Sequence, residues 1–366
     1  MRLTFIISSL GAAGAERIMS GLANHISQQG HHVSFITLDK SEADHYTLAK
    51  EINRIQLNIY TQSRNVFDSL IATLKRLIRI RRSIIATQPD VVLTFIDMSN
   101  IRVIAALLGS GLPIVVSERV DPSAYSIGAS WEWLRRRLYP FSAKLVVQTH
   151  SVENWAKTFM PAQKISVIPN FIRKVDLGNA KPSELPDKQT IIAAGRLVRQ
   201  KGFDILINAF HQSQLNKRGW QLVILGEGSD RVALENQISQ LDLNNCVLLP
   251  GQVTSIESWF EYANMFVLSS RFEGFPNVLL EAMACGLPCI AFDCPSGPSD
   301  IIRHMDNGLL ISPKNIDELS KAMQLLVDNQ VLADGLSSES VKIVEEYSIE
   351  RVANEWLNNF SSVSSS

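Results

Sequence analysis

Short apolar runs alternate with segments of helical periodicity along most of the chain. The runs LTFIISSL and HVSFITL flank Ala15–Gln28, whose apolar residues recur at helical spacing. A long basic amphipathic segment at 66–86 precedes four further apolar runs, which are DVVLTFI, LPIVVSE, KLVVQT and ISVIPN. Strands that alternate with helices predict βαβ units and a parallel sheet covered on both faces.

This pattern stops after Ile172 and then restarts. The stretch RKVDLGNAKPSELPDKQT is polar, contains two prolines and has no periodicity, so it predicts a linker. Six further strands are then expected, TIIAAGR, WQLVILG, CVLLPG, MFVLSS, PCIAF and NGLLIS, with helices at 202–214, 230–241, 316–328, 336–346 and 350–360. We therefore predict an α/β chain of two doubly wound, Rossmann-like domains that face each other across a cleft. They comprise residues 1–172 and 173–349.

Composition supports two globular domains and shows that their charges differ. The 366 residues are too many for one ordinary core, and 46% hydrophobic with 19% charged residues describe well-packed domains. The net charge of −1 hides an asymmetry, because residues 1–172 carry 19 Lys/Arg and 12 Asp/Glu whereas residues 173–366 carry 16 and 24. A basic half and an acidic half suggest different partners.

The cysteines and the N-terminus indicate a cytoplasmic protein. Spacings of 38, 3 and 4 intervening residues match neither a zinc site nor a disulfide framework, so we expect buried thiols. The first apolar run is too brief for a signal peptide, and no run approaches the ~20 apolar residues of a membrane span. The four cysteines are Cys246, Cys285, Cys289 and Cys294.

The first strand-to-helix turn, SSLGAAGAERI, contains two glycines. Gly11 and Gly14 permit a tight backbone turn, and the amides of the following helix could bind an anion. The G-x-x-G spacing lacks both the dinucleotide fingerprint and the Lys-Ser/Thr of a P-loop. A plain tight turn and a phosphate or acceptor contact therefore remain equal alternatives.

The turn AAGRLVRQKGFDIL follows the first strand of the second domain. Arg196 lies at the carboxyl end of that strand, and Lys201 comes just before the next helix. A planar guanidinium and a mobile ammonium at such an edge suit a diphosphate. Two solvated charges are the alternative interpretation.

The stretch RFEGFPNVLLEAMACGLP places Glu273 and Glu281 around the start of a helix. Pro276 suits the first helical turn, and the amides of residues 277–279 would lie at the positive end of the helix dipole. A ligand with a diphosphate flanked by two polyols, such as a nucleotide sugar, fits this spacing. A solvated pair and a glycosidase acid–base pair are the alternatives, and the nearby cations argue against the second.

Together, EGFPNVLLE, GRLVRQKG and GAAGAER resemble the retaining family-4 glycosyltransferases of GT-B fold, the group 1 glycosyl transferases of polysaccharide and O-antigen synthesis. The resemblance spans nearly the whole chain and implies that the last helix, with residues 350–366, packs on the first domain. It implies that Glu273 binds donor-sugar hydroxyls, that Glu281 binds the ribose, and that Arg196 and Lys201 hold the diphosphate. Glu273, Arg196 and Lys201 would be the catalytic group. The implied donor site comprises Gly14, Arg196, Lys201, Gly226, Val253, Glu273, Gly274, Phe275, Pro276, Asn277, Val278, Leu279 and Glu281.

The segment VVSERVDPS departs from better-known family members, which often have a histidine near this strand end. It resembles the SERxDP variant of polysaccharide and O-antigen glycosyltransferases, as does CPSGPSDII. We assign the acceptor site to Gly11, Glu118, Arg119 and Asp121. For Arg119 and Asp121, a contact with the donor and a structural role in shaping the cleft remain open as alternatives.

The resemblance implies transfer of a sugar from a nucleoside diphosphate to an acceptor hydroxyl with retention of configuration. No D-x-D pair occurs, so we expect a metal-independent enzyme without a cofactor, in which domain closure and electrostatics stabilise the leaving diphosphate. UDP-linked N-acetylhexosamine or hexose is the preferred donor, with GDP-mannose second. A nucleotide-sugar epimerase, which needs no acceptor, and a catalytically silent binding subunit, which would lack the charged pair, are the alternatives.

Two cationic segments suggest a membrane surface. KRLIRIRR (75–82) and WEWLRRRLYPF (131–141) suit anionic lipid, and a solvated basic face with core aromatics is the alternative. We expect peripheral association with the inner face of the cytoplasmic membrane and a lipid-linked saccharide acceptor. No nucleic-acid-binding motif accompanies these segments, so we expect no nucleic-acid partner.

Overall fold

The structure, a computed structural model, describes residues 1–39, 44–59, 66–123, 125–172, 175 and 178–364. The chain divides into two compact units, each built around one parallel sheet, which confirms the predicted α/β class. Unit 1 comprises Met1–Phe171 with Ile349–Ser366, and unit 2 comprises Ile172–Ser348. These boundaries lie one residue from the positions that the sequence pattern suggested.

Within the described residues, unit 1 contains a seven-stranded sheet of order β3-β2-β1-β4-β5-β6-β7, in which all paired strands are parallel. Its central strands β1 and β4 are buried, apart from Arg2 at the start of β1, because helices cover both faces. The sequence analysis missed β3, an edge strand with half-exposed residues and no apolar run. The strands are β1 (Arg2–Ile7), β2 (His32–Thr37), β3 (Asn53–Gln56), β4 (Val91–Phe95), β5 (Ile114–Ser117), β6 (Lys144–Val147) and β7 (Ile165–Val167).

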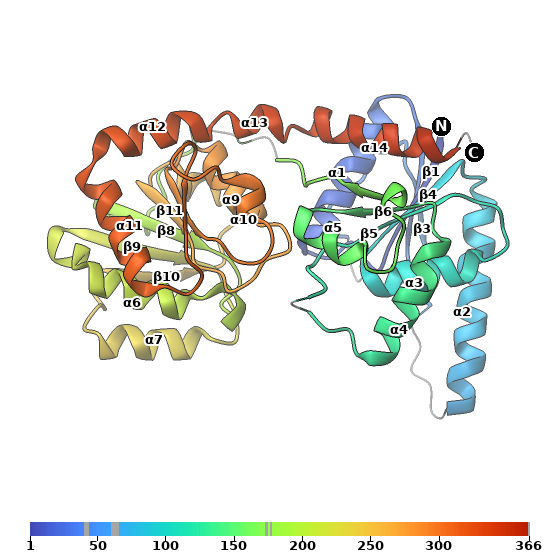
Figure 1. Cartoon of the computed structure of the whole chain (residues 1–366), viewed down its shortest axis with the longest axis horizontal. Helices are drawn as coiled ribbons and strands as arrows, with labels where there is room; N and C mark the ends of the chain where they lie inside the picture. Colours follow the sequence, from blue (N-terminus) through green and yellow to red (C-terminus); the bar gives the residue numbers. More distant parts are fainter. Residues whose placement is uncertain (40–43, 60–65, 124, 173–174, 176–177, 365–366) are drawn as a thin grey trace. The chain divides into compact units, whose positions relative to one another are not determined.

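Helices cover the two faces of this sheet and create two separate cores (Figure 1). One core joins the sheet to α1 and α14, and the other joins it to α2 and α3. The helices are α1 (Gly14–Gln28), α2 (Val66–Ala86), α3 (Asp97–Leu107), α4 (Ala129–Leu138), α5 (His150–Ala156) and α14 (Ile349–Ser364), with 3-10 turns at Tyr139–Phe141 and Ala162–Lys164.

The C-terminal helix α14 belongs to unit 1, as the resemblance implied. Its residues Trp356 and Phe360 are almost completely buried in the core of unit 1, and their ring centroids lie 5.8 Å apart. The Trp356 ring also lies 5.8 Å from that of Phe95, at the carboxyl end of β4. The last helix therefore supports the edge of the sheet at which β4 and β5 end.

Unit 2 contains, among the described residues, a six-stranded parallel sheet of order β10-β9-β8-β11-β12-β13. The strand order reverses between β8 and β11, and in sheets of this kind ligands bind beyond the carboxyl ends of the strands at such a switch point. The strands are β8 (Gln189–Ala194), β9 (Trp220–Leu225), β10 (Val247–Gly251), β11 (Met265–Leu268), β12 (Cys289–Phe292) and β13 (Leu309–Ile311).

The longer helices of unit 2 agree with the predicted ones except near the end, and the short helices α8 and α10 were not predicted. One helix was expected at 336–346, but α12 begins earlier, because Asn329 caps it by accepting a bond from the Leu332 amide, and a separate short helix follows. The helices are α6 (Phe203–Ser213), α7 (Arg231–Gln240), α8 (Glu257–Phe260), α9 (Asn277–Ala284), α10 (Pro298–Ile301), α11 (Ile316–Asp328), α12 (Gln330–Ser340) and α13 (Ile343–Glu346), with 3-10 turns at Arg199–Lys201 and Leu215–Arg218.

All four cysteines are free thiols in unit 2. Cys289 and Cys294 are buried, whereas Cys246 and Cys285 are half-buried. Burial, with the charge of nearby glutamates, raises the pKa of Cys285 and of Cys294 to about 12, so both stay protonated at neutral pH. Among the helices that the structure describes, none has the length and hydropathy needed to cross a membrane.

Candidate functional site

The turn between β8 and α6 carries Lys201 to the switch point of unit 2. A short 3-10 turn, Arg199–Lys201, ends at Gly202, whose φ of +66° favours glycine. A side chain at Gly202 would also collide with the chain, because its Cβ would lie 2.1 Å from the Ser269 carbonyl oxygen. Gly202 therefore allows the β8–α6 turn to pack directly against the segment that follows β11.

That second segment carries Glu273. The Glu273 carboxylate is 5% exposed, and its Oε1 accepts hydrogen bonds from Lys201 Nζ at 2.6 Å and from Ser270 Oγ at 2.5 Å. Among the described residues, both bonds fall on Oε1 and none on Oε2. The structure thus brings together two of the residues that the sequence motifs singled out, and adds Ser270.

A bidentate ion pair ties the same two turns together. The Arg271 guanidinium donates to Asp204 Oδ1 at 2.8 Å and to Oδ2 at 2.6 Å. The Arg271 amide donates to the Gln200 carbonyl at 2.7 Å, and the Gln200 side chain donates to the Phe272 carbonyl at 3.0 Å. Sequence analysis missed this clamp, since no local spacing links residues almost 70 positions apart.

The start of α9 differs from the expectation. Pro276 lies at the N-cap position, one residue before the helix, and was not correctly placed in its first turn. The amides of Asn277 and Leu279 donate to the carbonyls of Phe275 and Pro276, at 3.0 Å each. Within the described part of the chain, the amide of Val278 meets no acceptor, so it is the amide of this group best able to face an anion.

The CPSGPSDII segment packs beside this turn. Ser296 Oγ donates to the Gly274 carbonyl at 3.2 Å, and a Cβ on Gly297 would lie 2.6 Å from Pro276 Cδ. Phe275 is buried against Tyr347, with ring centroids 6.1 Å apart, and Glu281 is 7% exposed. The Glu-Gly-Phe-Pro turn is therefore fixed from two sides.

The remaining donor-site candidates of unit 2 occupy different surroundings. Arg196 is exposed and forms no ion pair among the described residues. Gly226 allows close approach of two turns, since its Cβ would lie 2.0 Å from the Gly195 carbonyl oxygen. Val253 lines a pocket of about 730 Å³ together with residues of β10, Trp259 and the segment 180–184. A contact of this pocket with the nucleotide base remains a prediction.

In unit 1, the glycine turn leads directly into α1, which begins at Gly14. Its N-cap residue, Ala13, has no side chain able to cap the helix, and a side chain at Gly11 would meet only Ser9 Oγ, at 3.5 Å. Glu16 in the first turn is 6% exposed, and burial raises its pKa. The turn is open, and no described contact assigns it to a ligand.

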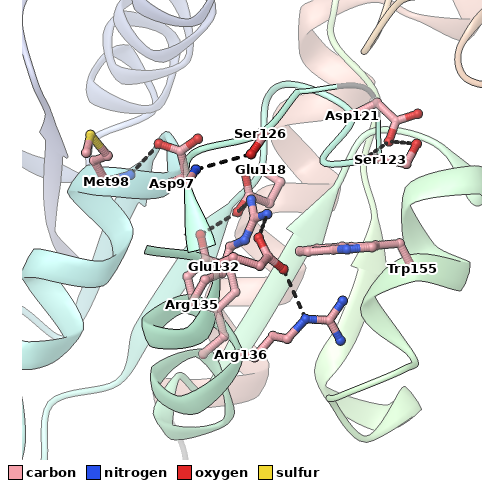
Figure 2. A network of polar contacts seen from close by, with 12 residues as sticks. Asp97, Met98, Glu118, Asp121, Ser123, Ser126, Glu132, Arg135, Arg136 and Trp155 are labelled. Atoms are coloured by element: carbon pink, nitrogen blue, oxygen red, sulfur yellow. Dashed lines mark hydrogen bonds and ion pairs between the residues drawn. The ribbon is translucent and has the colours of Figure 1, made fainter. Parts of the chain in front are cut away.

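Glu118 lies inside unit 1 rather than on its surface. It is 3% exposed, accepts a hydrogen bond from the Tyr139 hydroxyl at 2.5 Å and lies 3.4 Å from the Arg135 guanidinium. Arg135 also pairs with Glu132 and lies over the Trp155 ring, as Figure 2 shows. Burial outweighs these contacts and raises the pKa of Glu118 to about 7. Sequence analysis treated Glu118 as an acceptor ligand, but its contacts belong to an internal network.

Arg119 and Asp121 differ from Glu118 and from each other. The Arg119 guanidinium lies 4.3 Å from the centre of the Phe95 ring and donates to Ser117 Oγ at 3.3 Å and to the Asn170 side-chain oxygen. Asp121 is 2% exposed and holds its own turn, because its Oδ1 accepts bonds from the amide and hydroxyl of Ser123 (Figure 2).

The described residues contain no cluster of three or more His, Cys, Asp or Glu side chains arranged to hold a metal ion.

Two family models match the chain, one in each unit. The model described as Glycosyltransferase Family 4 matches residues 12–174, and the model described as Glycosyl transferases group 1 matches residues 179–344. Together they cover most of the sequence, including Gly14, Lys201 and the Glu273–Glu281 stretch. The chain is a family-4 glycosyltransferase.

Curated relatives of this family-4 glycosyltransferase are named for lipid-linked saccharide and lipopolysaccharide substrates. It is 26% identical, over 98% of its own length and 97% of the other, to a Campylobacter jejuni α-1,4-N-acetyl-D-galactosaminyltransferase that is named for a diphospho-undecaprenol-linked acceptor. It is 31% identical to lipopolysaccharide 1,6-galactosyltransferase of Salmonella typhimurium, over 46% of its length and 48% of the other.

Solved structures confirm the GT-B fold of this family-4 glycosyltransferase. HepE of Anabaena, crystallised with UDP, matches with a TM-score of 0.79 and 17% identity, over 99% of this chain and all of HepE. The lipopolysaccharide outer core galactosyltransferase WaaB matches with a TM-score of 0.80 and 22% identity, over 99% of both chains.

Proposed function

We propose that this glycosyltransferase is a retaining, metal-independent enzyme that moves a sugar from a nucleoside diphosphate to a hydroxyl of a lipid-linked saccharide. UDP-linked N-acetylhexosamine or hexose is the proposed donor, and cell-surface polysaccharide synthesis is the proposed pathway. The UDP complex of HepE and the N-acetylgalactosaminyl- and galactosyltransferase relatives support this choice.

The observation that carries the proposal is the Lys201–Glu273 pair at the switch point of unit 2. Lys201 supplies a positive charge for the diphosphate, and Glu273 Oε2 supplies an acceptor for sugar hydroxyls. The attraction between the two charges offsets part of the cost of removing them from water, and Ser270 adds a hydrogen bond to the carboxylate. The pair therefore offers a ligand an anion site and a hydroxyl site next to each other.

The other donor residues complete this arrangement. Arg196, exposed beyond β8, adds a mobile guanidinium for the diphosphate, and the Val278 amide adds a donor at the positive end of α9. Glu281, one turn inside α9, binds the ribose. As the diphosphate departs, these groups stabilise its growing charge, which lowers the barrier more than binding of the substrate alone would.

The acceptor side of the proposal rests on unit 1. Gly11, Arg119 and Asp121 form the acceptor-binding group, and Glu118 positions its neighbours from inside the unit. Helix α2 would hold the enzyme at the inner face of the cytoplasmic membrane, because Ile71, Leu74 and Ile78 form an exposed apolar stripe along it. Lys75, Arg79 and Arg82 are exposed beside that stripe, which is the pattern of an interfacial helix on anionic lipid.

The second cationic segment contributes less to this surface. In α4, Arg135 is directed into the interior and Arg136 pairs with Glu132, so only part of its charge is available. Trp131 packs against Arg102, whereas Trp133 is 59% exposed.

A donor screen tests the proposed activity. The purified chain is given UDP- and GDP-linked sugars with and without lipid-linked saccharide acceptors, and release of the nucleotide and the anomeric configuration of the product are measured. We expect acceptor-dependent release of UDP with retention, and loss of turnover in Glu273→Ala and in Lys201→Ala without unfolding. Wild-type turnover in either variant would refute the site, and product formed without any acceptor would favour an epimerase.

A further inference from the structure

Arg119 differs from Arg135, the fully buried arginine of the same network. Arg135 is 2% exposed and lies against two carboxylates, those of Glu118 and Glu132. Arg119 is half-buried, and no carboxylate among the described residues forms an ion pair with it. Its acceptors, Ser117 and Asn170, are neutral. Desolvation without a compensating charge lowers the pKa of Arg119 to about 9.

The structure holds the Arg119 guanidinium in one orientation. The guanidinium lies 4.3 Å from the centre of the Phe95 ring, which in turn packs against Trp356 of α14, with ring centroids 5.8 Å apart. Ser117 and Asn170 accept bonds from its two terminal nitrogens. A guanidinium has five N–H donors in one plane, so donors remain beyond these two bonds.

The position of Arg119 is that of a binding residue. It follows β5, and its platform Phe95 is the last residue of β4, which lies next to the switch point between β1 and β4. Ligands of doubly wound sheets bind at this carboxyl edge. Arg119 is partly removed from solvent at this edge, and neutral groups orient it. It therefore lacks the negative charge that normally accompanies a buried arginine.

We propose that Arg119 is the receptor for an oxyanion carried by the acceptor, a phosphate or a carboxylate. The proposal rests on the transferase function above and specifies the chemical class of its acceptor as anionic. The planar fork matches such groups in a bidentate geometry, which an ammonium cannot reproduce. Glu118 and Asp121 are carboxylates and would repel an anion, so Arg119 is the member of SERVDP that meets the oxyanion itself.

The first test is binding alone, which does not depend on transfer. Inorganic pyrophosphate and glucuronate are titrated calorimetrically into the full chain in saturating UDP, which occupies the donor site. We expect one of the two to bind the wild type and Arg351→Gln, which removes an exposed arginine of the same unit, but not Arg119→Gln. No binding of either probe to the wild type, or equal binding to both variants, overturns the proposal.

The second test is transfer with matched acceptors. One saccharide is offered as a neutral octyl glycoside, as an octyl diphosphate and as a form that contains a uronic acid. We expect Arg119→Gln to raise KM about ten- to a hundred-fold for the diphosphate or for the uronate, which identifies the source of the anion, and to leave the neutral acceptor within about twofold. Arg119→Lys should lie between the wild type and Arg119→Gln. Equal loss on the neutral acceptor, or weaker UDP binding, overturns the proposal.

Thermal unfolding separates this binding role from a structural one. A partly buried charge without a partner of opposite charge does not stabilise the fold, so Arg119→Gln should melt at or above the wild-type temperature. Adding the anion should raise the melting temperature of the wild type but not that of Arg119→Gln. A clear drop in melting temperature for both Arg119→Gln and Arg119→Lys, with anion binding intact, would make Arg119 a structural residue. If the wild type transfers no sugar but binds the anion through Arg119, the proposed transferase function fails and the anion site stands.

Discussion

Lys201 Nζ lies 2.6 Å from Glu273 Oε1, although 72 residues separate the two in the chain. They meet because each leaves the carboxyl end of one of two neighbouring parallel strands, β8 and β11. Ser270 donates to the same oxygen, so the carboxylate is fixed from two directions. A buried ion pair of this kind is poor evidence for stability but is well suited to present two opposite charges in a defined geometry.

Glu273→Gln should lower turnover of the donor while leaving the fold intact. The amide keeps the shape of the side chain and can still accept a hydrogen bond from Ser270. It lacks the negative charge, however, and that charge both orders Lys201 and strengthens hydrogen bonds from sugar hydroxyls. We expect a fall of about 100-fold or more in kcat/KM, measured as nucleotide release, with little change in melting temperature. Glu235→Gln, on the exposed face of α7, is the control and should behave as the wild type. Normal kinetics in Glu273→Gln would remove Glu273 from the donor site.

The Arg271–Asp204 pair should contribute to catalysis through position. Both residues are partly exposed, so the pair adds only about 0.5–1 kcal/mol to the free energy of unfolding. It joins the turns of Lys201 and Glu273, however, and its loss should change kcat/KM for the donor more than it changes stability. We expect Asp204→Asn and Arg271→Gln each to reduce kcat/KM about tenfold, and the double variant to reduce it no further than either single one.

A matched cycle on Arg218 and Asp328, an exposed pair of the same unit, serves as the comparison. Its variants should leave kcat/KM unchanged. Additive losses in the Asp204–Arg271 cycle would show that the two residues act independently and would contradict the clamp.

The sequence predicts those site residues that a short stretch of neighbouring residues marks, and it misses those whose partners depend on strand order. Lys201, Glu273 and Glu281 were identified because glycine, proline and charged residues mark strand-to-helix turns, and the parallel sheet then brings those turns to one edge. Arg271 and Asp204 carry no such mark, since their partnership depends on strand order. Likewise β3 has no apolar run, because it lies at the edge of its sheet.

In the SERVDP segment, the sequence did not reveal which side chains are directed into the interior of unit 1. Glu118, Arg119 and Asp121 suggested a ligand site, but just beyond the end of β5 the structure places Glu118 against Arg135 and Tyr139 and Arg119 over Phe95. Sequence reasoning could not tell these two directions apart, because the contacting residues belong to other elements of unit 1.

Glu118 should make the stability of the protein depend on pH. Its pKa is about 7 in the folded chain, against 4.5 when unfolded, so between these values the folded state keeps a proton that the unfolded state has lost. Stability therefore falls as pH rises from about 4.5 to 7, by up to about 3 kcal/mol, and this contribution stays constant at higher pH. Urea unfolding of the wild type and of Glu118→Gln across this range measures the difference.

Glu118→Gln keeps an acceptor for the Tyr139 hydroxyl and cannot ionise, so its stability should fall less over the same range. Asp97 titrates nearby with a raised pKa of its own and contributes to both curves, and in the wild type its charge also raises the pKa of Glu118. The conclusion therefore depends on the difference between the two curves. Parallel curves would mean that Arg135 keeps Glu118 ionised throughout.

The exposed stripe of α2 should bind anionic membranes. Leu74 is 60% exposed, with Ile71 and Ile78 on the same face of the helix, and Arg79 and Arg82 flank them. We expect the wild type to sediment with vesicles that contain phosphatidylglycerol but not with vesicles of phosphatidylcholine alone. Leu74→Ser should weaken binding about tenfold or more, because insertion of one leucine side chain contributes about 1.5–3 kcal/mol. Arg79→Gln should weaken it about fivefold, since each surface cation contributes about 1 kcal/mol.

Val331 provides the matched control for the contribution of the Leu74 side chain to vesicle binding. It is 84% exposed on α12, more than Leu74, but lies among acidic and polar residues of unit 2. Val331→Ser should therefore leave vesicle binding unchanged, whereas Leu74→Ser reduces it, if exposure combined with flanking cations is what the membrane recognises. Equal indifference of the wild type to both kinds of vesicle would exclude a lipid role for α2. A wild type that binds anionic vesicles as tightly as its Leu74→Ser variant does would assign the attraction to charge alone, with the apolar stripe left outside the membrane.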